Sequence, residues 1–131
     1  MPVDSNEPRL EINQITERVI NCVYRVRNTL GSGFLEKVYE NALAIELRES
    51  GLRVAQQHPI KVFNNNNLVG DFVADLLVED RVIVEMKAAK TLDDVHSAQC
   101  MNYLKATGLK VCLLVNFGRP RVDIKRIVLD F

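Results

Sequence analysis

Residues 68–87, with the sequence LVGDFVADLLVEDRVIVEMK, decide how the rest of this chain is interpreted. Two runs rich in valine, leucine and isoleucine, residues 68–78 and 82–86, lie on either side of the charged triplet EDR at 79–81. Short apolar runs that are separated by a brief polar turn are typical of a β-hairpin. The stretch therefore predicts two antiparallel strands joined by a three-residue turn.

The length of that turn determines which side chains face each other across the hairpin. A three-residue turn pairs Val78 with Val82, and the same register then sets Asp75 directly opposite Glu85. A two-residue turn would break this register. The sequence thus predicts two carboxylates on neighbouring strands, with their Cβ atoms about 5 Å apart.

Strand periodicity also predicts which side chains share a face of the hairpin. Successive side chains of a strand point to opposite faces, so Glu85 and Lys87 are expected on one face of the second strand. In the first strand, Asp75 is expected on the face opposite the apolar side chains, which are Phe72, Ala74, Leu76 and Val78. Two acids and one lysine are thereby brought to one place.

Such a group can perform chemistry or can be an ordinary strand surface. Opposed carboxylates repel each other, and a divalent cation with a preference for oxygen ligands, Mg²⁺ or Mn²⁺, would neutralise them. The Lys87 ammonium could then orient an attacking water and offset charge that builds up on a phosphate. The plain alternative is a solvated strand face on which Lys87 forms a salt bridge to one carboxylate. The first interpretation predicts metal-assisted hydrolysis of a phosphodiester.

Outside the hairpin, helical and strand patterns alternate along the chain. Apolar residues recur at spacings of three and four before glycines, and Asp93 and Asp94 fall in the first turn of the third helix. The expected elements are helices over 12–30, 34–50 and 92–107, strands over 52–63, 68–78, 82–86, 111–117 and 123–129, and a loop over the four asparagines 64–67.

This order, α-α-β-β-β-α-β-β, predicts an α/β fold with a central mixed sheet flanked by helices. The third helix joins two strands by a crossover, so one parallel pairing is expected among antiparallel hairpins. A chain of 131 residues has the length of one domain. We expect a single domain over 1–131, with a polar lead at 1–9.

The composition excludes several classes of protein. With 47% hydrophobic and 26% charged residues, the chain resembles folded domains and differs from disordered ones. Its apolar runs are far shorter than the roughly 20 residues of a membrane-spanning helix, and the N-terminus lacks a secretory signal. Cys22, Cys100 and Cys112 are scattered on apolar faces, without metal-binding spacing. We expect buried, reduced cysteines in a cytoplasmic protein that does not enter the membrane.

Charge is distributed unevenly along a chain whose formal net charge is zero. Residues 1–80 carry 8 Lys/Arg and 12 Asp/Glu, a net of −4, whereas residues 81–131 carry 9 and 5, a net of +4. A polyanion should therefore approach the second half. There, Arg119, Arg121, Lys125 and Arg126 could contact a phosphate backbone, although a run of charges is just as commonly a solvated face.

Four motifs resemble a known family. Asp75 followed ten residues later by Glu85-Met86-Lys87 is similar to the Asp…Glu-x-Lys signature of the PD-(D/E)XK nuclease superfamily. Residues 33–39, GFLEKVY, resemble the motif of the GxxExxY proteins within it. Residues 99–103, QCMNY, resemble the Gln-x-x-x-Tyr motif of RecB-like nucleases, and 113–118, LLVNFG, complete the match. The resemblance spans about residues 12–129 and implies a restriction-endonuclease-like core.

The resemblance also implies roles for individual residues. Asp75 and Glu85 would be metal ligands, the Met86 carbonyl a third ligand, and Lys87 the catalytic lysine. Glu36 would add an acid from the second helix. Gln99 could hold a phosphate or a water, and Tyr103, one helical turn later, could stack or form a hydrogen bond. The plain alternative for this pair is a polar flank of the helix. Tyr39 is expected to pack and to have no chemical role.

The implied activity is a nuclease that depends on Mg²⁺ or Mn²⁺, with nucleic acid as its partner. DNA is the first expectation, but the sequence does not distinguish DNA from RNA, single from double strands, or cutting at ends from internal cutting. A domain of this size has little surface for a duplex, so a homodimer or a protein partner is expected. The alternative is a non-catalytic module that retains the fold and binds nucleic acid or protein.

Overall fold

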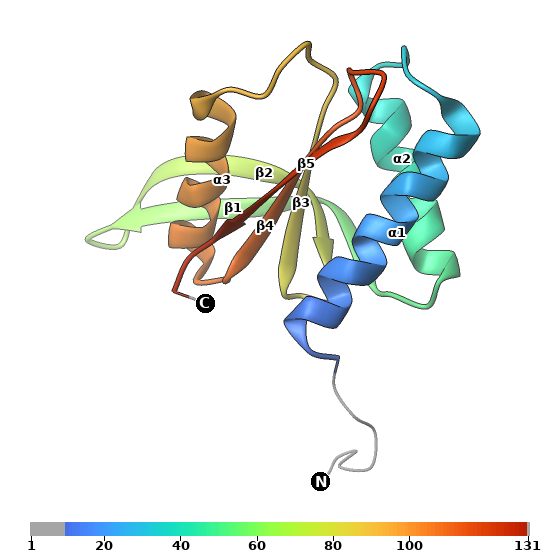
Figure 1. Cartoon of the computed structure of the whole chain (residues 1–131). Coiled ribbons are helices and arrows are strands. Elements are labelled where there is room, and N and C mark those ends of the chain that lie inside the picture. The colour runs from blue at the N-terminus through green and yellow to red at the C-terminus, as the bar shows by residue number, and fades with distance from the viewer. Residues whose placement is uncertain (1–9, 131) are drawn as a thin grey trace, which may run out of the picture.

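The computed structural model describes residues 10–130, so the predicted polar lead at 1–9 lies outside the described residues. Three helices and five strands follow the predicted order (Figure 1). The helices are α1 (Ile12–Leu30), α2 (Glu36–Glu49) and α3 (Asp94–Thr107), and the strands are β1 (Val54–Asn64), β2 (Asn67–Val78), β3 (Val82–Lys87), β4 (Val111–Asn116) and β5 (Asp123–Val128).

The five strands form one mixed sheet in the order β1-β2-β3-β4-β5. Only β3 and β4 pair in parallel, through the crossover that contains α3, and the other three pairings are antiparallel. The predicted fold class is therefore confirmed. Within residues 10–130, no helix combines the length and the apolar character that crossing a membrane requires.

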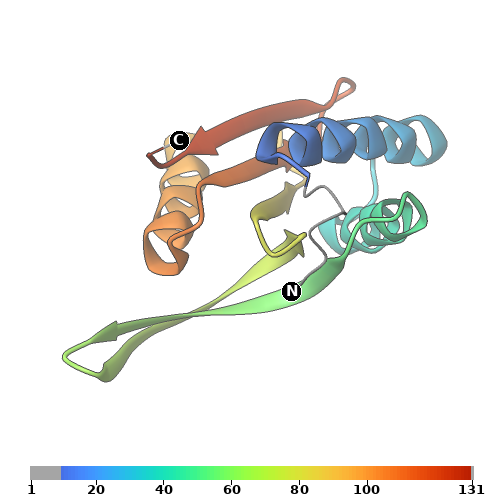
Figure 2. The ribbon, with the colours of Figure 1, turned by 90° about the horizontal axis from the view of Figure 1, so that it is seen from below.

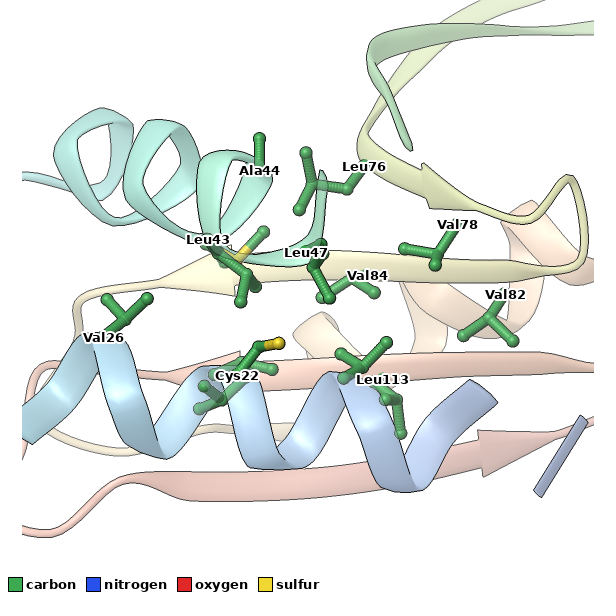
Figure 3. Packing of buried hydrophobic residues seen from close by; sticks show 14 of the residues in the cluster. Cys22, Val26, Leu43, Ala44, Leu47, Leu76, Val78, Val82, Val84 and Leu113 are labelled. Atoms are coloured by element: carbon green, nitrogen blue, oxygen red, sulfur yellow. The ribbon is translucent and has the colours of Figure 1, made fainter. Parts of the chain in front are cut away.

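Helices cover both faces of the sheet. The helices α1 and α2 pack on one face (Figure 3), where side chains such as Cys22, Leu43 and Leu47 meet Val84 and Leu113 from the strands. On the other face, α3 packs through its own apolar side chains. Each large aliphatic side chain that is buried in this way contributes roughly 1.5–3 kcal/mol. The two cores hold the strands that carry the candidate site.

All three cysteines are free and buried, as predicted. Cys22 belongs to the core under α1 and α2, whereas Cys100 and Cys112 belong to the core under α3. A side-chain hydrogen bond with Cys100 and burial together raise the pKa of the Cys112 thiol well above its ordinary value. These thiols therefore act as small apolar side chains.

Two helices begin later than predicted, and each has a local reason. The side chain of Asp93 accepts hydrogen bonds from the backbone N–H groups of Val95 and His96, so Asp93 is the N-cap of α3 and lies outside its first turn. The second helix begins at Glu36 because the backbone of Leu35 is extended, and no side chain caps this helix. A cap that satisfies the first N–H groups of a helix determines where the helix starts.

The predicted loop over four asparagines is shorter than expected. Asn64 and Asn67 pair with each other as the last residues of β1 and the first of β2. Only Asn65 and Asn66 form the turn, with φ angles of 51° and 63°. A two-residue hairpin turn needs left-handed backbone at both positions, and asparagine tolerates that conformation better than most residues.

The predicted alternation of side chains along β2 is wrong at Asp75. Leu76 and Val78 pack under α1 and α2, but Ala74 packs in the core under α3 and the Phe72 ring lies 6.0 Å from that of Tyr103. The apolar face therefore changes sides at Asp75. Regular pairing lapses there, because the ladder with β3 ends at Leu76 and Val84.

Beyond this point, β1 and β2 extend past β3 as a two-stranded arm, residues 58–74, which is called the arm below (Figure 2). Opposite Asp75, Gln57 is skipped in the pairing of the two strands and has a φ of 53°. Such an interruption lets a strand pair bend and twist. The bend brings the arm to the side of the sheet on which α3 lies.

Candidate active site

The two predicted carboxylates lie where β2 and β3 separate. Val78 pairs with Val82, so the predicted turn and register are confirmed. Past the last backbone pair, side chains replace the ladder: the Asp75 N–H donates to Glu85 Oε1 at 2.7 Å, and the Met86 N–H donates to Asp75 Oδ2 at 2.8 Å. The two acids are thereby fixed to neighbouring backbone, and this place is called the fork below.

The surroundings of the fork disfavour the charged forms of its two acids. Glu85 is only 5% exposed, and its burial, with the nearby charge of Asp75, raises its pKa to about 8. The hydrogen bond from the Asp75 N–H and the charge of Lys87 act in the opposite direction. Burial also raises the pKa of Asp75, which is only partly buried. A cation at the fork would relieve both effects.

Glu36 lies at the first position of α2, not on the sheet. Its Oε2 atom accepts a hydrogen bond from the Ala88 N–H at 3.1 Å, so it reaches the residue that follows Lys87. The helix start is positioned by Tyr39, whose hydroxyl donates to the Gly31 carbonyl at 2.6 Å. Glu36 therefore lies beside the end of β3 that carries Lys87.

Tyr39 packs, as predicted, and does not reach the fork. Its side chain is completely buried, and its ring stacks on Phe117 with the centroids 4.3 Å apart. The backbone N–H of Phe34 donates to its hydroxyl at 3.3 Å. In residues 33–39 the tyrosine is thus the structural member, and Glu36 is the one exposed toward the site.

Glu40 is a fourth acid that the sequence analysis missed. It is 3% exposed, and its two carboxylate oxygens accept hydrogen bonds from Gln56 at 2.8 Å and Gln57 at 2.9 Å and form an ion pair with Lys37 at 3.1 Å. Its negative charge is one of the causes that raise the pKa values of both acids at the fork. Its position four residues after Glu36, on the same side of a helix, was the available signal.

Asn116 is a second residue that the sequence analysis missed as a positioning group. It is completely buried at the end of β4. Its Oδ1 atom accepts from the Ala89 N–H at 3.0 Å, and its Nδ2 atom donates to the Ala89 carbonyl at 2.9 Å. The Phe117 N–H donates to the Lys87 carbonyl at 2.9 Å. These bonds fix the segment that leaves β3 immediately after Lys87.

Gly118 lets that segment approach β4 closely. A Cβ atom at this position would lie 2.4 Å from both the nitrogen and the carbonyl oxygen of Ala89, which is backbone that cannot rotate away. We expect Gly118→Ala to lower the free energy of unfolding by about 1–3 kcal/mol, as overpacking does. Urea denaturation measures this loss of stability.

Gly70→Ala is the matched control for Gly118→Ala. Its nearest neighbour would be the Phe72 ring at 3.0 Å, and Phe72 is 44% exposed and can move. A smaller loss of stability is expected there. Equal losses for the two variants would contradict the close approach at Gly118.

Gln99 and Tyr103 lie together on α3, as their spacing predicts. Gln99 Nε2 donates to the Tyr103 hydroxyl at 2.8 Å, and that hydroxyl lies 3.5 Å from the Val73 carbonyl of β2. Burial, followed by the charges of Glu85 and Asp75, raises the pKa of Tyr103 to about 12. The pair therefore borders the fork from the α3 side.

The four predicted basic contacts are divided between two places. Arg119 and Arg121 line a shallow pocket of about 310 Å³ at the turn between β4 and β5, directly after Gly118. Lys125 and Arg126 lie further along β5, where Arg126 donates to Asn13 Oδ1 at 2.7 Å. Only the two turn arginines are near the segment that follows Lys87.

A metal ion at the fork would have two carboxylates as its side-chain ligands. Among residues 10–130, no three His, Cys, Asp or Glu side chains gather into a group that could hold a metal ion. Within these residues, one carboxylate oxygen of Asp75 and one of Glu85 accept a hydrogen bond from the backbone. Mg²⁺ takes one or two protein carboxylates and completes its shell with water and phosphate oxygens, so this donor set fits it.

A sequence model described as the PD-(D/E)XK nuclease superfamily matches residues 13–127, which include every acid described above. The chain belongs to the PD-(D/E)XK nuclease superfamily. No curated protein sequence matches it. The matched residues contain both the fork and the two helices that border it.

Two solved structures share the fold of this superfamily member. An alkaline exonuclease from Laribacter hongkongensis aligns with a TM-score of 0.53 and 15% identity, over 94% of this chain and 73% of the exonuclease. A protein named SSO0001 aligns with a TM-score of 0.55 and 16% identity, over 91% of this chain and 60% of the other. These likenesses support the fold.

Proposed function

We propose that this protein hydrolyses phosphodiester bonds of nucleic acid with the help of a divalent metal ion. The observation that carries the proposal is the fork, where the partly buried Asp75 and the buried Glu85 lie beside each other with raised pKa values, and Lys87 follows Glu85 by two residues. Two acids held in this way lower the stability of the fold unless a cation neutralises them or a reaction uses their raised pKa values. Membership of a nuclease superfamily supports this function.

Each residue of the site has a distinct task in the proposal. Asp75 and Glu85 would hold Mg²⁺ or Mn²⁺, with the Met86 carbonyl as a further ligand. When bound, the ion supplies Lewis-acid stabilisation of the phosphate. Lys87 orients the attacking water and offsets the charge that develops on the phosphate oxygens. Glu36 holds the backbone after Lys87 in place through Ala88.

The substrate would approach over α3 and the turn between β4 and β5. Gln99 is proposed to hold a phosphate or a water, and Arg119 and Arg121 to contact the backbone of the nucleic acid. DNA is the first candidate. The narrower assignment to the GxxExxY proteins, the cytoplasmic location and a homodimer or protein partner also stay proposals that rest on the sequence.

Cleavage of labelled oligonucleotides tests the proposed function. We expect the protein to cut in Mg²⁺ or Mn²⁺ and to lose all cutting in EDTA, on at least one of four substrates: single- or double-stranded DNA or RNA. Linear and circular forms distinguish cutting at ends from internal cutting. Calorimetry should detect Mn²⁺ binding to the wild type.

Asp75→Asn is the control variant, because it keeps the size of the side chain and removes its charge. Asp71→Asn is its match, since Asp71 lies on the arm in an exposed pair with Lys61 at 3.3 Å. Asp71→Asn should cut like the wild type, and Asp75→Asn should not cut. Absence of cutting and of Mn²⁺ binding in the wild type would instead support a binding module that retains the fold.

A further inference from the structure

A pocket of about 380 Å³ lies between α3 and the arm. Val62 and Phe72 line it from the arm, and Gln99, Asn102, Tyr103 and Lys105 line it from α3. Figure 2 shows the arm extending past β3 toward the end of the molecule where α3 lies. The volume of the pocket falls within the range of roughly 300–1,000 Å³ that is usual for small-molecule sites.

The walls of the pocket combine flat apolar surface with amide groups. The rings of Phe72 and Tyr103 lie 6.0 Å apart and are tilted by 51°, and Phe72 keeps 44% of its surface exposed. Asn102 and Lys105 follow Gln99 at successive steps of three, so the three polar side chains share one side of α3. A ligand that suits these walls is a planar aromatic ring with hydrogen-bonding edges and an anionic group nearby.

The pocket adjoins the acids through two shared residues. Tyr103 and Gln99 line the pocket, and the Tyr103 hydroxyl lies 3.5 Å from the carbonyl of Val73, two residues before Asp75. The nearby charges of Asp75 and Glu85 contribute to the raised pKa of Tyr103. A group bound in the pocket would therefore lie on the α3 side of the fork, which Tyr103 and Gln99 border.

We propose that this pocket binds an unpaired nucleobase next to the cleaved phosphodiester, so that the substrate is a single strand of nucleic acid. The inference rests on the proposed function for the position of the phosphate. The base stacks on Phe72. Asn102 meets its polar edge, and Lys105 faces a phosphate. A base within a duplex has both faces stacked and its pairing edge occupied, so it does not enter.

Fluorescence of a base analogue tests the pocket without any cleavage. A short oligothymidylate that carries one 2-aminopurine is titrated with protein in EDTA, and stacking on an aromatic ring quenches the probe. We expect strong quenching with the wild type. Because base stacking on an aromatic side chain is worth about 1–3 kcal/mol, Phe72→Ala should weaken binding roughly 5- to 150-fold and remove the quenching.

Two further variants keep the result interpretable. Phe63→Ala is the matched control, because Phe63 lies on the same arm, is 60% exposed and is not a lining residue of the pocket. It should bind and quench like the wild type. Asn102→Ala, on the exposed side of α3, should weaken binding without disturbing the arm. Circular dichroism verifies that each variant is folded.

The outcomes separate this inference from the proposed function. Quenching that depends on Phe72, in a protein that cuts no substrate, supports the pocket and overturns the nuclease. Cutting that is unaffected by Phe72→Ala, Asn102→Ala or an abasic site beside the cleaved bond overturns the pocket and leaves the nuclease. A wild type that binds no single strand, or a preference for duplex that the variants keep, also overturns the pocket.

Discussion

The Glu85→Gln variant is expected to be more stable than the wild type at pH 8 without metal, and to be inactive. Glu85 is 5% exposed, and burial followed by the charge of Asp75 raises its pKa from 4.5 to about 8. Glutamine keeps the shape and can still accept the hydrogen bond from the Asp75 N–H, but it carries no charge. The substitution therefore removes a buried charge and a metal ligand together.

The direction of the pH dependence follows from the two states of the protein. In the unfolded chain Glu85 loses its proton near its ordinary pKa of 4.5, and in the folded protein near 8. The folded state thus binds a proton more tightly, and stability falls as the pH rises between these values. Because a tenfold change in proton affinity corresponds to about 1.4 kcal/mol, the loss is up to about 5 kcal/mol.

Urea denaturation in EDTA at pH 4.5 and pH 8 measures this effect. Wild type and Glu85→Gln should have similar stability at the lower pH, and the variant should be more stable by about 2–5 kcal/mol at the higher pH. Asp71→Asn is the control, because Asp71 is an exposed residue paired with Lys61. It should show no gain at pH 8. An equal gain in both variants would contradict a specific penalty at Glu85.

Addition of Mn²⁺ should reverse the order of stabilities. A ligand that binds only the folded state raises the free energy of unfolding by an amount that grows with the logarithm of its concentration above the Kd, so the wild type should gain thermal stability from Mn²⁺ at pH 8. Glu85→Gln should gain little and should not cut nucleic acid. If the variant gained as much as the wild type, Glu85 would not be a ligand.

The central hairpin could be predicted because its determinants are local in sequence. The three residues 79–81 set the turn and the turn set the register. Past the last backbone pair, the same register brought Asp75 next to Glu85. Helix positions were predictable for the same reason, from spacing and from glycines at the helix ends. Each of these features is determined by residues that lie close to it in the sequence.

Features that depend on contacts between distant segments could not be predicted. Glu40 is buried because Gln56 and Gln57 of β1 fold over it, and Asn116 is bound to Ala89 across the sheet. The change of face at Asp75 arises where the ladder with β3 stops, which no alternation within β2 reveals. Tertiary packing determines all three.

The Lys87→Met variant is expected to cut roughly 100- to 1,000-fold more slowly than the wild type, the usual cost of losing a charge that stabilises a transition state. Lys87 follows Glu85 by two residues, and the Phe117 N–H fixes its carbonyl at 2.9 Å. Its charge lowers the pKa of Asp75 and of Glu85. Methionine keeps most of the length of the side chain and removes that charge.

Two roles of Lys87 can be separated by pH. If it only balances the two acids, its loss raises their pKa values, metal binding weakens at neutral pH, and both binding and cutting recover at high pH. If it also acts on the phosphate, cutting stays slow even where Mn²⁺ binding has recovered. We expect the second pattern, measured as kcat at saturating Mn²⁺ from pH 6 to pH 9.5.

Lys90→Met is the matched control, because Lys90 is an exposed residue of the same segment and is not among the charges that shift the pKa of either acid. It should retain the activity and metal affinity of the wild type. Full recovery of Lys87→Met at high pH would limit the lysine to charge balance. Persistent loss with intact Mn²⁺ binding would assign it to the transition state, where an ammonium beside the carboxylates can act only on the substrate or the attacking water.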